Sequence, residues 1–237
     1  MQRRLLVFGG LAVALLVLGG GGFYAYYFSG LRSAPKQLAL STPSPAATAT
    51  GQTGLTGKWT VGTGSLAGYR VNELFVGTTT PHQAVARTST VSGSVTVGAD
   101  SGGAYPLSAI TFSAGLADLA SVDQVAGRDV RLRDNVVSRS LDVQGFPSAT
   151  FTADTGTAPE AVTGSPVDLT VPGKLTIHGV TKSVTATGRA QLNGGRVEIA
   201  GSLPIDMTDY GVQPPRIGFT TVDSKVTIDF DLFLSKG

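Results

Sequence analysis

The stretch KVTIDFDLFLS, residues 225–235, alternates apolar and polar residues over almost its whole length. Successive side chains of a β-strand point to opposite faces of the sheet. One face of this stretch is therefore apolar, with Val226, Ile228, Phe230, Leu232 and Leu234. The other face carries Thr227, Asp229, Asp231 and Ser235. This period of two predicts a half-buried strand, with its carboxylates on the solvated side.

The same pattern returns toward the N-terminus, for example over residues 184–192 and 197–205, with Asn193-Gly194-Gly195 as a turn between them. Eight such strands can be drawn between Gly57 and Gly237. Many short antiparallel strands with few helices predict a sandwich or a barrel. Strands that alternate in and out suit a closed barrel, and eight strands enclose either packed side chains or one ligand. We therefore predict an all-β, eight-stranded antiparallel barrel.

The segment Ser121–Ser138 interrupts the alternation, and we predict one or two short helices there. Its apolar residues lie among acids and arginines. Arg128, Asp129 and Arg133 have two interpretations. They form ion pairs on a helix surface, which contribute about 0–1 kcal/mol, or they lie at the barrel mouth as lid residues.

Residues before the barrel predict attachment to a membrane. Leu5–Phe28 is a run of 24 residues without a charged side chain, directly behind Arg3 and Arg4. About 20 apolar residues suffice for a transmembrane helix. We expect a transmembrane anchor over residues 1–28, with cleavage of a signal peptide as the alternative. Residues 29–56 are rich in Ala, Thr, Ser and Pro, which predicts a disordered linker. The domain, residues 57–237, is then expected on the extracytoplasmic side of the cell membrane in a single-pass protein.

Composition and motifs exclude several classes of function. Four of the 18 basic residues and none of the 16 acidic ones precede Gly57, so the domain carries 14 basic against 16 acidic residues. Such a balance does not favour nucleic acid binding. The chain has no cysteine and only two histidines, His82 and His178, and it lacks the common catalytic motifs. We therefore assign no catalytic residue, no metal and no cofactor. The sequence leaves the oligomeric state open.

Three segments, in this order, carry a family resemblance: residues 119–133 with Gly-Arg-Asp-Val-Arg-Leu-Arg, residues 146–151 with Phe-Pro-Ser-Ala-Thr-Phe, and residues 173–184 with Gly-Lys-Leu-Thr-Ile-His-Gly-Val-Thr-Lys. Together with residues 207–212 they resemble the YceI-like family of lipocalin-like domains, which bind polyisoprenoid lipids. The likeness covers about 180 residues. Arg131 stands where the family segment usually has a histidine, and His82 is the one candidate for the family's early histidine.

The resemblance implies an elongated barrel whose apolar interior holds an isoprenoid tail, such as that of a quinone or a polyprenyl carrier. It implies a binding protein rather than an enzyme. The residues expected to contact the lipid are Ile110, Phe112, Val125, Leu132, Phe146, Phe151, Leu175 and Ile177. Arg128, Asp129 and Arg133 are expected at the mouth. A barrel filled by its own side chains, acting as a structural or interaction domain of the cell envelope, remains the alternative.

Overall fold

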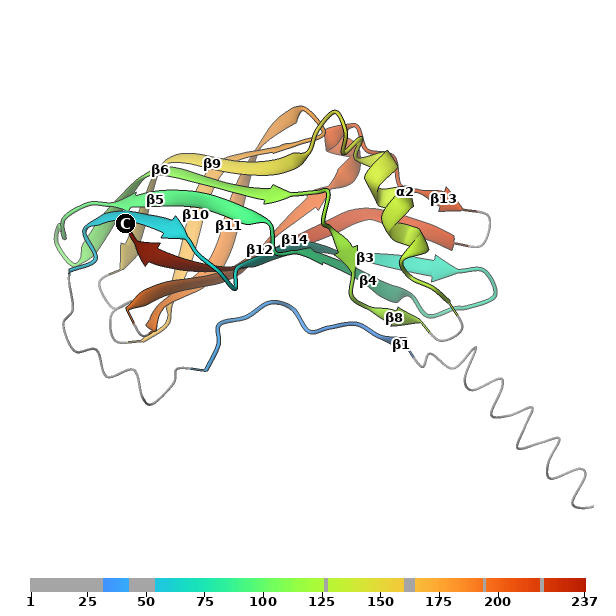
Figure 1. Ribbon diagram of the computed structural model, residues 1–237, viewed down its shortest axis with the longest axis horizontal. Coiled ribbons are helices and arrows are strands. Elements are labelled where there is room, and N and C mark those ends of the chain that lie inside the picture. The colour runs from blue at the N-terminus through green and yellow to red at the C-terminus, as the bar shows by residue number, and fades with distance from the viewer. Residues whose placement is uncertain (1–31, 43–53, 126–127, 160–164, 194, 218–219) are drawn as a thin grey trace, which may run out of the picture.

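A computed structural model describes residues 32–42, 54–125, 128–159, 165–193, 195–217 and 220–237 (Figure 1). The longer strands are β2 (Gly57–Val61), β3 (Leu66–Phe75), β4 (His82–Thr88), β5 (Val91–Val97), β6 (Ala104–Gly115), β9 (Ser148–Pro159), β10 (Val167–Ile177), β11 (Val180–Asn193), β12 (Arg196–Asp206) and β14 (Thr220–Lys236). Four short strands are β1 (Arg32–Ser33), β7 (Ala120–Ser121), β8 (Gln124–Val125) and β13 (Arg216–Ile217). The helices are α2 (Leu132–Ser140) and the 3-10 helix η2 (Met207–Tyr210).

The long strands form an antiparallel sheet that closes on itself. β14 pairs with β12 along one edge and with β2 and β3 along the other. β2 and β3 together count as one strand of the ring, and β4 and β5 together count as its neighbour. The reason is that β2 pairs with β5, and β3 pairs with β4, in nearly the same register. Counted this way, the described residues make an eight-stranded barrel. β6, β9, β10 and β11 complete the ring between β5 and β12.

The predicted fold class is confirmed as an all-β, eight-stranded antiparallel barrel with one short α-helix in the described part of the chain. That helix, α2, lies in the segment where helix was predicted. The same segment also contributes β7 and β8, which contact β4 and β1. Its mixed spacing is explained by these two short strands followed by a helix.

β14 alternates as predicted, and its apolar residues line the barrel interior. The outward carboxylate of Asp229, however, is not solvated, and Asp231 is partly buried. Asp229 has an exposed fraction of 0%, and its carboxylate accepts a hydrogen bond from Arg70 Nε at 3.0 Å. On β12, Glu198 is also fully buried. The expectation of an exposed acidic face is therefore wrong, because other parts of the chain cover it.

Residues 32–42, here called the N-terminal strap, provide this cover by running along the outside of the barrel (Figure 1). Ser41 donates two hydrogen bonds to Glu198, from its backbone N–H and from its hydroxyl, each 2.6 Å long. The Leu38 N–H donates to Asp229 at 3.3 Å. Gln191 completes the contact by donating from its side chain to the Ser41 carbonyl and to Glu198.

Two arginines hold the middle of the N-terminal strap. Arg70 donates from Nη1 to the Pro35 carbonyl at 2.9 Å, and Arg87 donates from Nη2 to the Lys36 carbonyl at 2.6 Å. At its beginning, the strap pairs with β8 through β1. Backbone groups of the strap thus form hydrogen bonds with charged side chains of the barrel wall. Those charged groups would destabilise the fold if they were buried without partners.

The prediction of a disordered linker over residues 29–56 does not hold for residues 32–42, because these residues have defined partners on the barrel. The barrel unit also extends slightly before Gly57, since Leu55 is buried and its carbonyl accepts a hydrogen bond from Trp59 Nε1. The predicted anchor, residues 1–28, lies outside the described residues. No helix in the described part of the chain has the length and apolar character needed to cross a membrane.

The N-terminal strap yields a first prediction. Ser41→Ala removes the hydroxyl donor from the buried Glu198 carboxylate, so we expect a loss of about 1–2 kcal/mol in the free energy of unfolding. We also expect faster tryptic cleavage after Lys36, measured by mass spectrometry of limited digests. Thr42→Ala, at the next and exposed position, is the matched control and should change neither quantity. Equal behaviour of the two variants would show that the strap is not held by this bond.

Candidate functional site

The barrel encloses an outer chamber of about 610 Å³ next to α2. Its walls are mostly apolar, and its inner surface includes alternate residues of β3: Ala67, Tyr69, Val71, Glu73 and Phe75. Leu132, at the start of α2, also lines this chamber although 69% of the residue is exposed. The chamber therefore opens to solvent at the α2 end of the barrel.

An inner chamber of about 190 Å³ lies deeper, and apolar residues such as Trp59 and Leu234 line it. The two chambers share four lining residues, Ala67, Ala114, Ala149 and Ile228. The two chambers therefore adjoin inside the barrel. Both are mostly apolar, and the inner chamber is the smaller.

The structure brings ten of the eleven predicted site residues onto this space. The inner chamber is lined by Ile110, Phe112, Phe151 and Leu175. The outer chamber is lined by Val125, Leu132 and Ile177, and by the three predicted mouth residues Arg128, Asp129 and Arg133. Phe151 fits because Gly173, on the neighbouring strand, has no side chain where the phenyl ring lies.

Phe146 is the exception, since it lines neither chamber. It follows α2, and its ring meets His178 edge-on with 5.0 Å between the ring centroids. The turn at His178 and Gly179 joins β10 to β11, and Gly179 has a φ of 73°. A side chain at Gly179 would clash with the Phe146 ring. Phe146 therefore packs on a turn outside the barrel interior.

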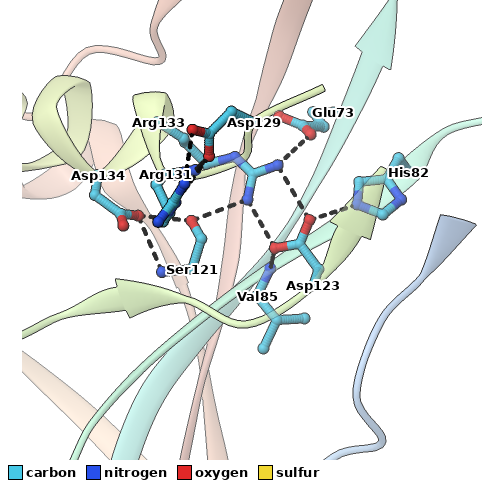
Figure 2. A network of polar contacts seen from close by, with 9 residues as sticks. All are labelled: Glu73, His82, Val85, Ser121, Asp123, Asp129, Arg131, Arg133 and Asp134. Carbon is cyan, nitrogen blue, oxygen red and sulfur yellow. Dashed lines mark hydrogen bonds and ion pairs between the residues drawn. The ribbon is translucent and has the colours of Figure 1, made fainter. Parts of the chain in front are cut away.

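A buried ionic network lies beside the outer chamber, and two of its members, Glu73 and Arg133, line that chamber (Figure 2). The Arg133 guanidinium donates to Glu73 at 2.6 Å and to Asp123 at 2.7 Å. Asp123 is also 2.7 Å from His82 Nε2 and accepts a hydrogen bond from the Val85 N–H. The side chains of Glu73, His82 and Asp123 are each 5% exposed or less. Arg133 thus connects α2 to the barrel wall from inside.

These contacts set the protonation of Asp123. Burial raises the pKa of its carboxyl, but hydrogen bonds from His82 and Arg133 outweigh burial and lower the pKa to about 2. The carboxylate is therefore ionised at neutral pH. Nearby in the outer chamber, burial raises the pKa of the Tyr69 hydroxyl, which stays neutral. The chamber thus offers a neutral hydroxyl and a compensated ion pair in a mostly apolar wall.

Glu73, His82 and Asp123 place one potential ligand atom each within 4.8 Å of one another, a grouping that can hold a metal ion. Arg133 already bonds both carboxylates of this group. A cation would have to displace the guanidinium from a buried position. We therefore interpret the group as an ion-pair network that fixes α2.

Three further contacts lie at the mouth. Arg128 lies over the Phe75 ring, with its guanidinium carbon 4.3 Å from the centroid, and Phe75 stacks on His82. Asp129 pairs with the exposed Arg131 at 3.0 Å. Each predicted mouth residue thus has its own partner: Phe75 for Arg128, Arg131 for Asp129 and the buried network for Arg133.

Sequence reasoning missed Glu73, His82 and Asp123. A signal for Glu73 was present, because it occupies an inward position of β3 between Val71 and Phe75. A charged residue on an otherwise apolar strand face indicates a buried partner. The identity of that partner could not be read, since Arg133 is 60 positions away.

The family model of the YceI-like domain matches residues 60–234 of the chain. The protein belongs to the YceI-like family. Two UPF0312 proteins of Pseudomonas putida, from strains W619 and GB-1, are each 30% identical to it over 95 residues, which is 38% of this chain. This YceI-like chain spans about half of their length, 47% in each case.

A solved structure has a similar fold to this YceI-like protein. It is a polyisoprenoid binding domain from Saccharophagus degradans implicated in plant cell wall breakdown. The TM-score is 0.52 with 17% sequence identity, over 76% of this chain and 98% of that one. At this identity the likeness concerns the fold.

The buried network yields a second prediction. Arg133→Met leaves two carboxylates buried without their cation, so we expect a loss of about 3–5 kcal/mol in the free energy of unfolding at pH 7. Urea denaturation of the full chain measures this loss. Arg131→Met, whose side chain is 79% exposed, is the matched control and should change stability little.

The loss should also depend on pH. The pKa of Asp123 is lowered from 3.8 to about 2, so its contribution is present above pH 4 and disappears as the pH falls toward 2. The difference between the native chain and Arg133→Met should therefore narrow over that interval. A difference that stays constant from pH 7 to pH 2 would contradict the assigned role of Arg133.

Proposed function

We propose that this protein is a membrane-tethered, extracytoplasmic binding protein for a long-chain isoprenoid lipid, such as a quinone or a polyprenyl carrier. The observation that carries the proposal is the pair of adjoining apolar chambers inside the barrel. A flexible apolar chain suits a space that is narrow, deep and mostly without polar groups. The polyisoprenoid binding described for the structurally similar domain of Saccharophagus degradans supports this ligand class.

The energetics favour a long tail. Each CH₂ group transferred from water into an apolar site gains roughly 0.8 kcal/mol. A long isoprenoid therefore binds without many polar contacts, provided that the site has no unpaired charge. Arg133 pairs with both Glu73 and Asp123 within the network, so neither carboxylate is left without a partner.

We infer a direction for the bound lipid from the distribution of polar groups. The inner chamber is almost wholly apolar, whereas the outer chamber presents Tyr69, Arg133 and Tyr210. The tail then enters the inner chamber, and a head group stays near α2. Phe112 and Phe151 contact the tail, and Arg128 and Asp129 lie beside the head group.

The membrane part of the proposal rests on the sequence. Leu5–Phe28 is long enough and uncharged, and it precedes a domain whose ligand is a membrane lipid. A tether keeps the barrel at a high effective concentration near its ligand source. An extracytoplasmic location is consistent with the absence of cysteine and with the Ala-, Thr- and Pro-rich segment before the barrel.

A binding measurement tests the lipid. The full chain in detergent should bind a long-chain ubiquinone, and Ile177→Asp should weaken this binding at least about ten-fold, because a carboxylate on the chamber wall must be desolvated. Thr176→Asp is the matched control, since the Thr176 hydroxyl bonds Thr181 away from the interior. Circular dichroism first checks that both variants fold. Equal weakening would contradict the assigned inner face, and no binding by the native chain would favour the structural alternative.

Cell fractionation tests the tether. The protein should remain in the membrane pellet after an alkaline carbonate wash, and protease added to intact cells should degrade the barrel. Release of a soluble fragment that begins near Ser29 would instead indicate a cleaved signal. Protection of the barrel in intact cells would place it on the cytoplasmic side.

A further inference from the structure

Large hydrophobic side chains are exposed mainly at one end of the barrel. Leu74 lies near the end of β3, Val76 begins the turn to β4, and Val122 lies between β7 and β8. They are 40%, 71% and 40% exposed, respectively. The end of β3, β8 and α2 lie together at the right-hand end in Figure 1. Apolar side chains exposed at one end of a barrel can contribute to an interaction site.

The outer chamber opens at the same end. Leu132 of α2 lines the chamber and is 69% exposed, which places it at the opening. Leu74, Val76 and Val122, here called the rim residues, do not line the chamber. The rim residues therefore belong neither to the barrel core nor to the wall of the outer chamber.

The N-terminal strap begins beside this opening. Its first paired residue, Arg32, lies opposite Val125 of β8, and Val125 lines the outer chamber. Only three residues separate Arg32 from Phe28, where the uncharged run ends. Four peptide steps reach at most about 14 Å. The strap thus reduces the tether between the proposed anchor and the barrel to a few residues.

We propose that this end of the barrel docks on the surface of the lipid bilayer, with the rim residues in its interfacial layer and the outer chamber open toward the lipid. The proposal rests on the proposed function and adds the surface through which the lipid enters. The short tether supplies a high local concentration, so that a few apolar side chains suffice for docking.

The charges at this end are compatible with a lipid surface. Arg131 is 79% exposed and Arg128 is exposed beside it. Arginines at this depth extend toward the phosphate groups while their aliphatic parts stay in the apolar layer. The acidic partner, Asp129, is paired with Arg131, and Glu73 and Asp123 are buried.

The absence of cysteine allows a direct test, because one introduced cysteine is a unique labelling position. Val76→Cys carries an environment-sensitive fluorophore at the rim. Ala99→Cys carries it in the exposed turn between β5 and β6, at the opposite end of the barrel. The full chain is reconstituted into phosphatidylcholine vesicles. We expect blue-shifted emission at position 76 that lipid-borne spin labels quench, and water-like emission at position 99.

A functional arm separates docking from lipid binding. Val76→Asp should slow transfer of ubiquinone from vesicles to the protein several-fold, while its affinity for ubiquinone in detergent stays unchanged. Ala99→Asp should alter neither. Water-like emission at position 76 would overturn the docking surface, whether or not the vesicles retain the chain. Transfer of ubiquinone to Val76→Asp at the native rate would overturn it as well. Loss of ubiquinone binding by the native chain in detergent would instead overturn the proposed function.

Discussion

Closure of the sheet through β14 is the constraint on which the rest of the structure depends. β14 pairs with β12 on one side and with β2 and β3 on the other, so the ring of strands has no free edge along it. Backbone hydrogen bonds are then satisfied within the wall, and the interior needs no polar groups for that purpose. This allows the barrel to keep an apolar space instead of a fully packed core.

The charges follow from the same constraint. An apolar interior tolerates a carboxylate only if a cation accompanies it. At the mouth, Arg133 supplies that cation from α2 and thereby fixes the helix over the opening. On the outer wall, Arg70 pairs with Asp229 beneath the N-terminal strap. Ion pairs thus hold α2, and hydrogen bonds to charged side chains of the wall hold the N-terminal strap.

The sequence predicted those features that depend on neighbouring residues. Alternation in β14 is local, and it correctly assigned the residues that face the barrel interior. The burial of Asp229 was not predictable from this pattern, because its partners Arg70 and Leu38 are 159 and 191 positions away. The order of the N-terminal strap was missed for a related reason. Its composition is that of a linker, and apart from the Ser41 hydroxyl its hydrogen bonds to the wall described above use backbone groups that any sequence carries.

The folded unit of this chain includes the N-terminal strap, whereas the unit that the family shares does not. The family model begins at residue 60, well after the strap. A fragment trimmed to that boundary would expose Glu198 and Asp229 to water and remove three of their donors. The N-terminal strap is thus a cover that this chain supplies for two acids of its own barrel wall, and its bonds to Glu198 and Asp229 lie outside the range of the family model.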